Sequence, residues 1–337
     1  MTGMPTQPAP PGRRPTIGEV ALLAGVSQGT VSRALNGKRW VSDETREAVA
    51  EAVRKTGYRP NAQARGLKLR RSGIVAVLLG ERIDRLFGDP NFAVLLRGIS
   101  ESLAARGSSM VLLLAGEEHD RARALELAAS GQVDGAIFVS WYDSDAIVEA
   151  LDRIAVPVVF CGNPTTVRPG TSFVCADDFA ASARIVEHLR SRGRSRIAMI
   201  AHSTPERVDG YLHALGDLAD PSIVEHGDYS RESGYAAMQR LLSQDPTIDA
   251  VFAGNDLMAA GAIDALKDAG RRVPEDVAVG GFDDSAVATQ VEPALTTIHQ
   301  PFDRISRELT RLLLDQIDGL PGAQIRIGSE LVVRDST

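Results

Sequence analysis

Residues 25–36 read Gly-Val-Ser-Gln-Gly-Thr-Val-Ser-Arg-Ala-Leu-Asn, which predicts a tight turn followed by a short amphipathic helix. Gly25 suits a turn that needs a positive φ, and the Ser27 hydroxyl can cap the new helix. An apolar stripe at positions i, i+3 and i+4 faces a small core and consists of Val31, Ala34 and Leu35. The opposite face carries no acid and consists of Ser27, Gln28, Ser32 and Arg33.

This acid-free face suits the major groove of DNA, where Arg, Gln and Ser side chains hydrogen-bond base edges. The alternative interpretation is the solvated face of an ordinary small helical domain. Residues 17–24 favour DNA binding, because their apolar pattern predicts a first helix at the distance that a helix-turn-helix requires.

Three further motifs follow in order: Val41-Ser42, Thr45-Arg46 and Gly57-Tyr58-Arg59-Pro60-Asn61. Together with residues 17–36 they resemble the head of LacI/GalR-type transcriptional regulators, without gaps through Leu67 and more loosely almost to the C-terminus. The resemblance implies a repressor that binds double-stranded operator DNA and needs no cofactor. The residues expected at the DNA are Thr16, Ser27, Gln28, Gly29, Thr30, Ser32, Arg33, Asn36, Trp40, Asn61 and Leu67. For Trp40, packing on the small core remains an equal alternative.

Residues 61–71 are expected to form a hinge between a head at 16–60 and a body at 72–337. Asn61 can cap a helix, but two turns of helix that contain a glycine are not stable alone in water. The resemblance implies a hinge helix that folds on the operator, with Leu67 wedged into the minor groove. The alternative is a plain linker with one incidental leucine.

Charge is divided unevenly along the 337 residues, whose net charge is −7. Residues 1–72 hold 13 basic and 5 acidic residues, a balance of +8, whereas the remainder holds 24 and 39, a balance of −15. A basic head on an acidic body concentrates the attraction to phosphate at one end. The proline-rich residues 1–15 are expected to be a disordered lead-in rather than a signal peptide.

The body alternates β-branched apolar runs with helical patterns, which predicts an α/β fold with a doubly wound parallel sheet in each of two lobes. The resemblance implies a periplasmic-binding-protein type I body, crossed three times by the chain. Lobe one is expected at about 73–172 and 299–325, and lobe two at about 173–298. The apolar stripe of the helix at 302–317 is a candidate for core or dimer packing and consists of Ile305, Leu309, Leu312 and Leu313.

An effector is expected between the lobes, at the carboxyl ends of the strands. Asn255 and Asp256 follow a predicted strand, where a carboxylate can accept two hydroxyl hydrogen bonds, although helix capping is the alternative. The resemblance implies four further effector contacts, which are Arg207, Tyr229, Gln300 and Phe302. Phe92, which follows the loop after the first strand, is expected to line the lobe-one side of the cleft. For Arg207 the alternative is a surface salt bridge, and for Tyr229 a core aromatic beneath a loop.

The expected effector is a sugar-like or nucleobase-like molecule. Many sugar-binding members of the family place Asp-Arg where this chain has Gly162-Asn163, so lobe one is expected to lose a carboxylate. That difference favours a neutral or acidic effector. The loop at 80–90 is longer and more charged than is usual in the family.

Two other classes of function are disfavoured. A solute receptor of a transporter would share the body but require export, and an enzyme would need a nucleophile, metal or cofactor motif that the sequence lacks. Cys161 and Cys175 lie in apolar runs and are expected to be buried free thiols. The predicted protein is a cytoplasmic, nucleoid-associated homodimer or tetramer that binds no membrane and no metal.

Overall fold

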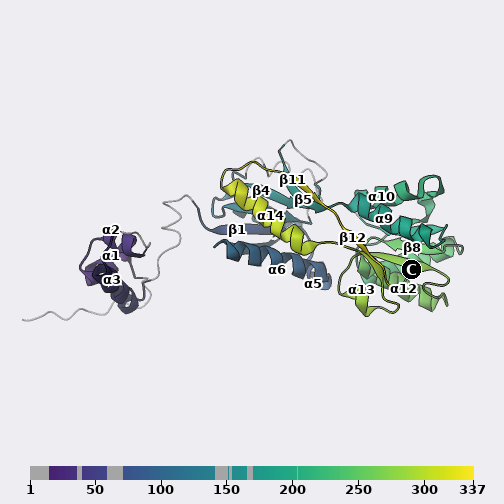
Figure 1. The fold of residues 1–337 in the computed structure, drawn as a ribbon, viewed down its shortest axis with the longest axis horizontal. Coiled ribbons are helices and arrows are strands. Elements are labelled where there is room, and N and C mark those ends of the chain that lie inside the picture. The colour runs from purple at the N-terminus through teal and green to yellow at the C-terminus, as the bar shows by residue number, and fades with distance from the viewer. Residues whose placement is uncertain are drawn as a thin grey trace, which may run out of the picture. The chain divides into compact units, whose positions relative to one another are not determined.

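The computed structural model describes residues 15–35, 40–58, 71–140, 151, 154–164, 170–202 and 204–337. The chain divides into two compact units, residues 1–72 and 73–337, each of which is described by itself (Figure 1). In the described part of the chain, no helix has both the length and the apolar character needed to cross a membrane.

The smaller unit contains a helix-turn-helix followed by a third helix: α1 (Ile17–Ala24), α2 (Gln28–Leu35) and α3 (Asp43–Thr56). Gly25 ends α1 with a φ of 66°, the left-handed conformation that glycine adopts without strain. The predicted stripe of α2 packs on a small core whose buried members are Val20, Ala21, Val31, Val49 and Ala52. Trp40 is 91% exposed, so the core alternative for this residue is wrong.

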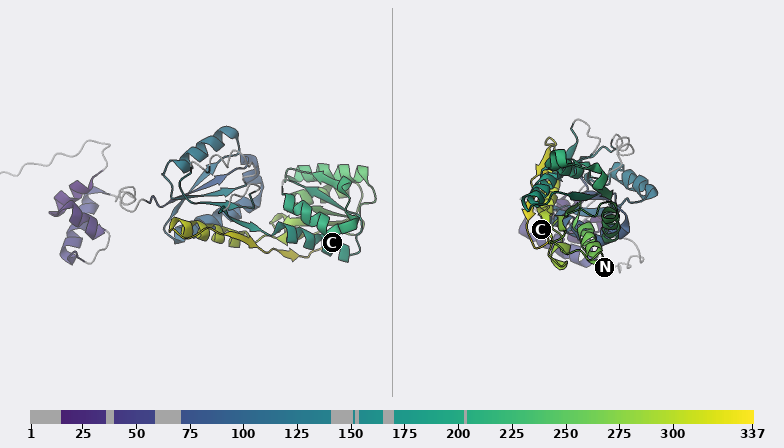
Figure 2. Two further views of the ribbon diagram at one scale, coloured as in Figure 1. Left: turned by 90° about the horizontal axis from the view of Figure 1, so that it is seen from above. Right: turned by 90° about the vertical axis from the view of Figure 1, so that its right-hand side faces the viewer.

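The larger unit contains two six-stranded sheets, one in each lobe (Figure 2). The strands of lobe one, in sheet order, are β11 (Gln324–Ile327), β5 (Ser172–Ala176), β4 (Val158–Cys161), β3 (Gly135–Val139), β1 (Ile74–Leu79) and β2 (Ser109–Leu114). Those of lobe two are β12 (Glu330–Val332), β10 (Thr296–His299), β9 (Ala278–Asp283), β8 (Ala250–Ala253), β6 (Ile197–Ala201) and β7 (Val224–His226). The pairings are parallel except that β12 runs antiparallel to β10, which confirms the predicted α/β class.

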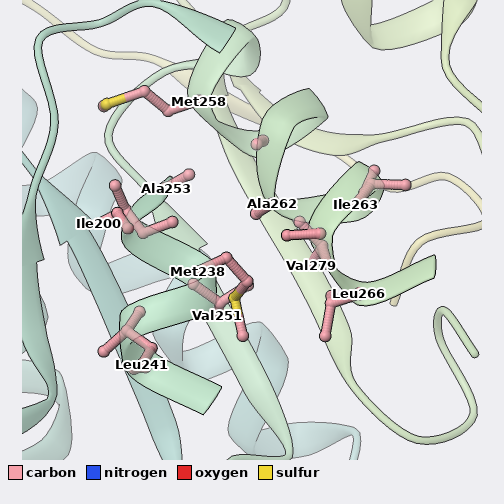
Figure 3. Close-up of a cluster of buried hydrophobic side chains, with 14 of the residues drawn as sticks. Ile200, Met238, Leu241, Val251, Ala253, Met258, Ala262, Ile263, Leu266 and Val279 are labelled. Carbon is pink, nitrogen blue, oxygen red and sulfur yellow. The ribbon is translucent and has the colours of Figure 1, made fainter. Parts of the chain in front are cut away.

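Helices cover both faces of each sheet. In lobe one, Val75 and Val77 of β1 face α6 (Pro90–Ala105) and α14 (Phe302–Ile317), whereas Ala76 and Leu78 face α7 (Glu118–Ala129). In lobe two, α9 (Asp178–Ser191) and α10 (Pro205–Leu215) cover one face. The other face is covered by α11 (Arg231–Gln244) and α12 (Asp256–Asp268), whose core side chains are drawn in Figure 3.

The helix α14 has the predicted bounds, and its apolar stripe is buried against α6 and the sheet of lobe one. That stripe therefore belongs to the core, which corrects the alternative that it packs in a dimer.

The chain passes between the lobes after β5, after β10 and after β11. The first passage comes later than the sequence suggested, because β5 pairs with β4 and β11 in lobe one instead of opening lobe two. The charged segment at 80–90 was read as a loop but contains the helix α5 (Ile83–Gly88). The sequence pattern of residues 144–154 predicts a helix, and most of these residues fall outside the described part of the chain.

Candidate functional site: the interlobe cavity and the DNA-facing helix

A cavity of about 190 Å³ lies where the carboxyl ends of the strands of both lobes meet. Five of the seven predicted effector residues line it: Phe92, Arg207, Tyr229, Gln300 and Phe302. Lobe one contributes the ends of β3, β4 and β5, and lobe two contributes residues after β6, β7 and β9. The sequence-based expectation of a cavity at this edge of the two sheets agrees with this placement.

Arg207 is the most buried cation of the cavity and is held between two acids of lobe two. Its Nε donates to Asp178 Oδ2 at 3.2 Å, and its Nη2 lies 3.8 Å from Asp283 Oδ1. A further guanidinium nitrogen donates to the carbonyl of Gly254, and the Cζ atom lies 3.7 Å from the centre of the Phe282 ring. The surface salt bridge considered for this residue is therefore wrong, because Arg207 is buried with its partners.

Three buried acids surround this arginine, and burial raises the pKa of each one. The pKa of Asp283 is raised well above its usual range, since burial and the charges of Asp89 and Asp256 outweigh Arg207. Burial also raises the pKa of Asp178 and of Asp89, although Arg207 opposes both shifts. The raised pKa values mean that these acids take up protons more readily than free carboxyls, so a ligand hydroxyl, which can both donate and accept a hydrogen bond, suits the cavity.

Asn255 and Asp256 do not line the cavity, so their expected position at the cleft is corrected. Asn255 caps α12 by accepting from the Met258 N–H at 2.9 Å, and its amide donates to the carbonyl of Tyr229 at 3.0 Å. Asp256 accepts from the Ser285 N–H at 2.6 Å and from the Thr297 hydroxyl at 2.5 Å. Asn255 thus holds the backbone of the cavity residue Tyr229, whereas Asp256 links the Ser285 backbone to the Thr297 side chain behind the cavity residue Asp283.

Burial raises the pKa of Asp256 to about 7, against the hydrogen bonds from Thr297 and Ser285. The folded protein therefore holds a proton that the unfolded chain releases near pH 4, and stability falls as the pH rises from about 4 to about 7. We expect Asp256→Asn to remove this loss, which amounts to at most about 1.4 kcal/mol per pH unit. Urea unfolding at pH 5, 6, 7 and 8 measures the effect.

The matched control for that experiment is Asp264→Asn, because Asp264 is a partly exposed acid of α12 that pairs with Arg231 at the surface. The free energy of unfolding of Asp256→Asn, relative to wild type, should increase with pH, whereas that of the control should not. A constant difference across the four pH values contradicts the assignment.

Tyr229 lies at a strained corner of the cavity. Its φ is 70°, and the other non-glycine residues with positive φ in the described chain are Ser140, Asp283 and Asp284. Its hydroxyl is 2.8 Å from the Thr204 hydroxyl, and its ring meets the edge of His202 at 4.1 Å between centroids. Three of the four strained residues line the cavity, as is typical of binding sites whose surroundings hold the strain in place.

Two hydrogen bonds cross directly between the lobes. Asn91 Nδ2 of lobe one donates to Asp283 Oδ2 at 2.9 Å, and Asn163 Nδ2 donates to Glu206 Oε1 of lobe two at 2.6 Å. The two lobes are thus in direct contact beside the cavity. Asn163 belongs to the Gly162-Asn163 pair, which stands where many sugar-binding members of the family have Asp-Arg.

Lobe one nevertheless supplies a carboxylate, because Asp89 caps α6 and lines the cavity. The carboxylate expected to be lost at Gly162-Asn163 is indeed absent there, but Asp89 gives lobe one another acid in the cavity. The cavity residues that the sequence analysis did not identify include Arg85, Asp89, Asp178, Glu206 and Asp283. For Asp283 a signal was present, since it ends a predicted strand just as Asn255 and Asp256 follow one.

The polar face of α2 is exposed, as a DNA-binding surface requires. Ser27 caps the helix by accepting from the Thr30 N–H at 3.1 Å, and the two hydroxyls are 2.9 Å apart. Arg33 Nε donates to the carbonyl of Gly29 at 3.1 Å. Its guanidinium therefore lies along the helix, beside Gly29, which has no side chain. Gln28 is exposed and Ser32 is half-buried on the same helix.

Thr16 lies at the start of α1, where its hydroxyl and the Glu19 carboxylate form a reciprocal cap. The other predicted DNA contacts, Asn36, Asn61 and Leu67, fall outside the described residues. In the described residues, no group of His, Cys, Asp or Glu is arranged to hold a metal ion.

Both units of the chain match known protein families, and relatives match the chain over nearly its whole length. The family described as bacterial regulatory proteins, lacI family, matches residues 16–61, and a periplasmic binding protein-like domain matches residues 186–337. The HTH-type transcriptional regulator CelR of Thermobifida fusca is 41% identical over 96% of this chain and 98% of its own.

Solved structures give the same result. A transcriptional regulator CelR–cellobiose complex matches with a TM-score of 0.77 and 38% identity, over 96% of this chain and 100% of its own. The lac repressor dimer bound to operator and the anti-inducer ONPF matches with a TM-score of 0.85 and 27% identity, over 96% and 99%. The chain therefore belongs to the lacI family of bacterial regulatory proteins and is a DNA-binding transcriptional repressor rather than an enzyme.

Proposed function

We propose that this repressor binds a palindromic operator as a homodimer and that a neutral sugar in the interlobe cavity controls the binding. The observation that carries the proposal is the cavity itself, in which buried acids with raised pKa stand beside the aromatic rings of Phe92, Tyr229 and Phe302. Acids accept hydrogen bonds from hydroxyl groups, and aromatic rings pack against the apolar faces of sugar rings.

The cavity is lined by four acids and three arginines, so its opposite charges largely offset each other and a neutral ligand suits it; these residues are Asp89, Asp178, Glu206, Asp283, Arg85, Arg207 and Arg326. The similarity to a CelR–cellobiose complex supports a β-linked glucose disaccharide as the first ligand to test. Isothermal titration of the full chain with cellobiose measures this binding. If no neutral sugar gives a heat of binding, the proposed sugar effector is wrong.

Dimeric binding follows from the small size of the reading surface. One α2 helix offers only a few base contacts, so two half-sites are needed for useful specificity. The lac repressor structure that matches this chain is a dimer on its operator, which supports the same assembly here. Assembly into a tetramer is an extension of the proposal, and sedimentation of the free protein distinguishes the two sizes.

Arg33→Ala should lower affinity for the cognate operator by about 1–3 kcal/mol while changing affinity for random DNA much less. The guanidinium must leave the Gly29 carbonyl to reach a base edge, and alanine cannot make that contact. Gel shifts on the full palindrome, a half-site and a scrambled duplex measure both effects at a stated salt concentration. Arg54→Ala on α3, whose guanidinium pairs with Glu51, is the matched control. Equal losses on cognate and random DNA would show that α2 does not read sequence.

A further inference from the structure

Arg85 belongs to lobe one but reaches across the cavity to lobe two. It lies on the short helix α5, in the charged segment between β1 and α6, and its side chain is 19% exposed. The Cζ atom stands 3.9 Å from the centre of the Tyr229 ring, so the guanidinium and the ring are in cation–π contact. One face of this aromatic ring is therefore already covered.

The guanidinium of Arg85 is fixed at one end and unsatisfied at another. Nη1 donates to Glu81 Oε2 at 2.7 Å, within a pair that is largely shielded from solvent. The Nε atom is buried, and no group in the described chain accepts a hydrogen bond from it. A buried donor without an acceptor is costly, and such atoms in native structures call for an explanation.

In the described part of lobe two, a buried hydrogen-bond acceptor of the same cavity lacks a donor. Asp178 gives one carboxylate oxygen to Arg207, while its Oδ1 atom is buried and has no donor among the described residues. Both atoms are buried at the cavity and lack a partner among the described residues, so a ligand group in the cavity is the candidate partner for each.

We propose that Arg85 is a specificity-determining contact of the effector, whose Nε–H donates to a hydroxyl or ether oxygen of a neutral polyhydroxylated ligand. The inference rests on the proposed function, in which the effector binds this cavity. A hydroxyl group both donates and accepts, so one polyol can satisfy Arg85 Nε and Asp178 Oδ1. An anion could accept from Arg85 but would leave Asp178 Oδ1 without a donor and would face the other cavity acids.

A second role for Arg85 has to be separated from this one. Its positive charge opposes the raised pKa of Asp89, so the residue could act only by balancing the charge of the cavity. Lysine supplies the same charge, but it lacks the Nε–H and the planar group that covers Tyr229. Arg85→Lys therefore restores charge balance without restoring the contact, and Arg85→Met removes both.

The experiment is isothermal titration of the full chain with three probes: cellobiose, D-glucose and glucose 6-phosphate. The variants are wild type, Arg85→Met, Arg85→Lys and the control Arg82→Met, whose guanidinium is exposed on the same segment and pairs with Asp84 and Glu117. Wild type should bind a neutral sugar and not the phosphate. Both Arg85 variants should bind that sugar at least about tenfold more weakly, because a charge-assisted hydrogen bond is lost. The control should stay within about twofold of wild type.

The possible outcomes separate this inference from the proposed function. If wild type binds none of the probes, or only the phosphate, the neutral-sugar function fails and the Arg85 assignment fails with it. If wild type binds a neutral sugar and both Arg85 variants bind it equally well, only the Arg85 assignment fails. Wild-type affinity in Arg85→Lys alone would assign Arg85 to charge balance and overturn the contact. The unfolding temperature without ligand shows that each variant is folded.

Discussion

Arg207→Met is expected to destabilise the larger unit by about 3–5 kcal/mol and to abolish the response to effector. The side chain is buried between Asp178 and Asp283, and methionine would leave both carboxylates without their cation. Breaking a buried pair from one side is costly because the remaining charge keeps its desolvation penalty. Differential scanning calorimetry of the full chain measures the transition of the larger unit. Gel shifts with and without cellobiose measure the response.

Two further variants test the cause of this loss. Arg231→Met removes an arginine that pairs with Asp264 on the surface, and such pairs contribute about 0–1 kcal/mol. The double variant Arg207→Met with Asp283→Asn removes one of the uncompensated acids, so it should recover part of the lost stability. If Arg207→Met costs no more than Arg231→Met, the buried triad does not stabilise the fold.

Gly261→Ala is expected to cost at least about 1–3 kcal/mol of stability, because α12 crosses α11 with no room for a side chain at this position. A Cβ atom on Gly261 would lie 2.0 Å from the carbonyl oxygen of Arg231 and 2.6 Å from the nitrogen of Tyr235. Both are backbone atoms, so the helices themselves must move apart. Gly88→Ala is the control, since nothing lies within 4 Å of its Cβ position and alanine stabilises helices. Equal unfolding temperatures for the two variants would contradict the close crossing.

The head could be predicted almost completely, because its signals are local. The positive φ of Gly25, the cap at Ser27 and the stripe of α2 each depend on residues within one or two turns. Most strands of the body were also predicted from their β-branched runs, but β11 and β12 were not. The sequence did not show to which lobe β5 belongs. That assignment depends on pairing with β4 and with β11, which lies about 150 residues away in the chain.

The cavity could be predicted only in part, for a reason that Asp256 and Asp283 illustrate. Both lie at the carboxyl end of a strand, and neither periodicity nor spacing shows which carboxylate faces the cleft. The backbone of Asp283 has a φ of 104°, which directs the chain in a way that no local rule predicts for aspartate. Arg85 was missed because α5 has charged residues and no clear apolar period, so the segment resembled a loop.

The late position of α14 and β11 in the sequence has a consequence for how the protein is made. The helix α6 packs against α14, which the ribosome completes only after it has made all of α9 to α13. At about 5–20 residues per second, the roughly 200 intervening residues take about 10–40 s. Throughout that interval Leu95, Ile99 and Leu103 of α6 can pack with β1 and β3, but the face at Gly98, which meets Ser306 of α14, lacks its partner on the nascent chain. Lobe two is continuous from α9 to β10, but its edge strand β12 follows β11, so both lobes are completed only at the end of synthesis. We expect the emerging polypeptide to depend on chaperones at this stage, and a stalled chain ending before residue 302 to be captured by them.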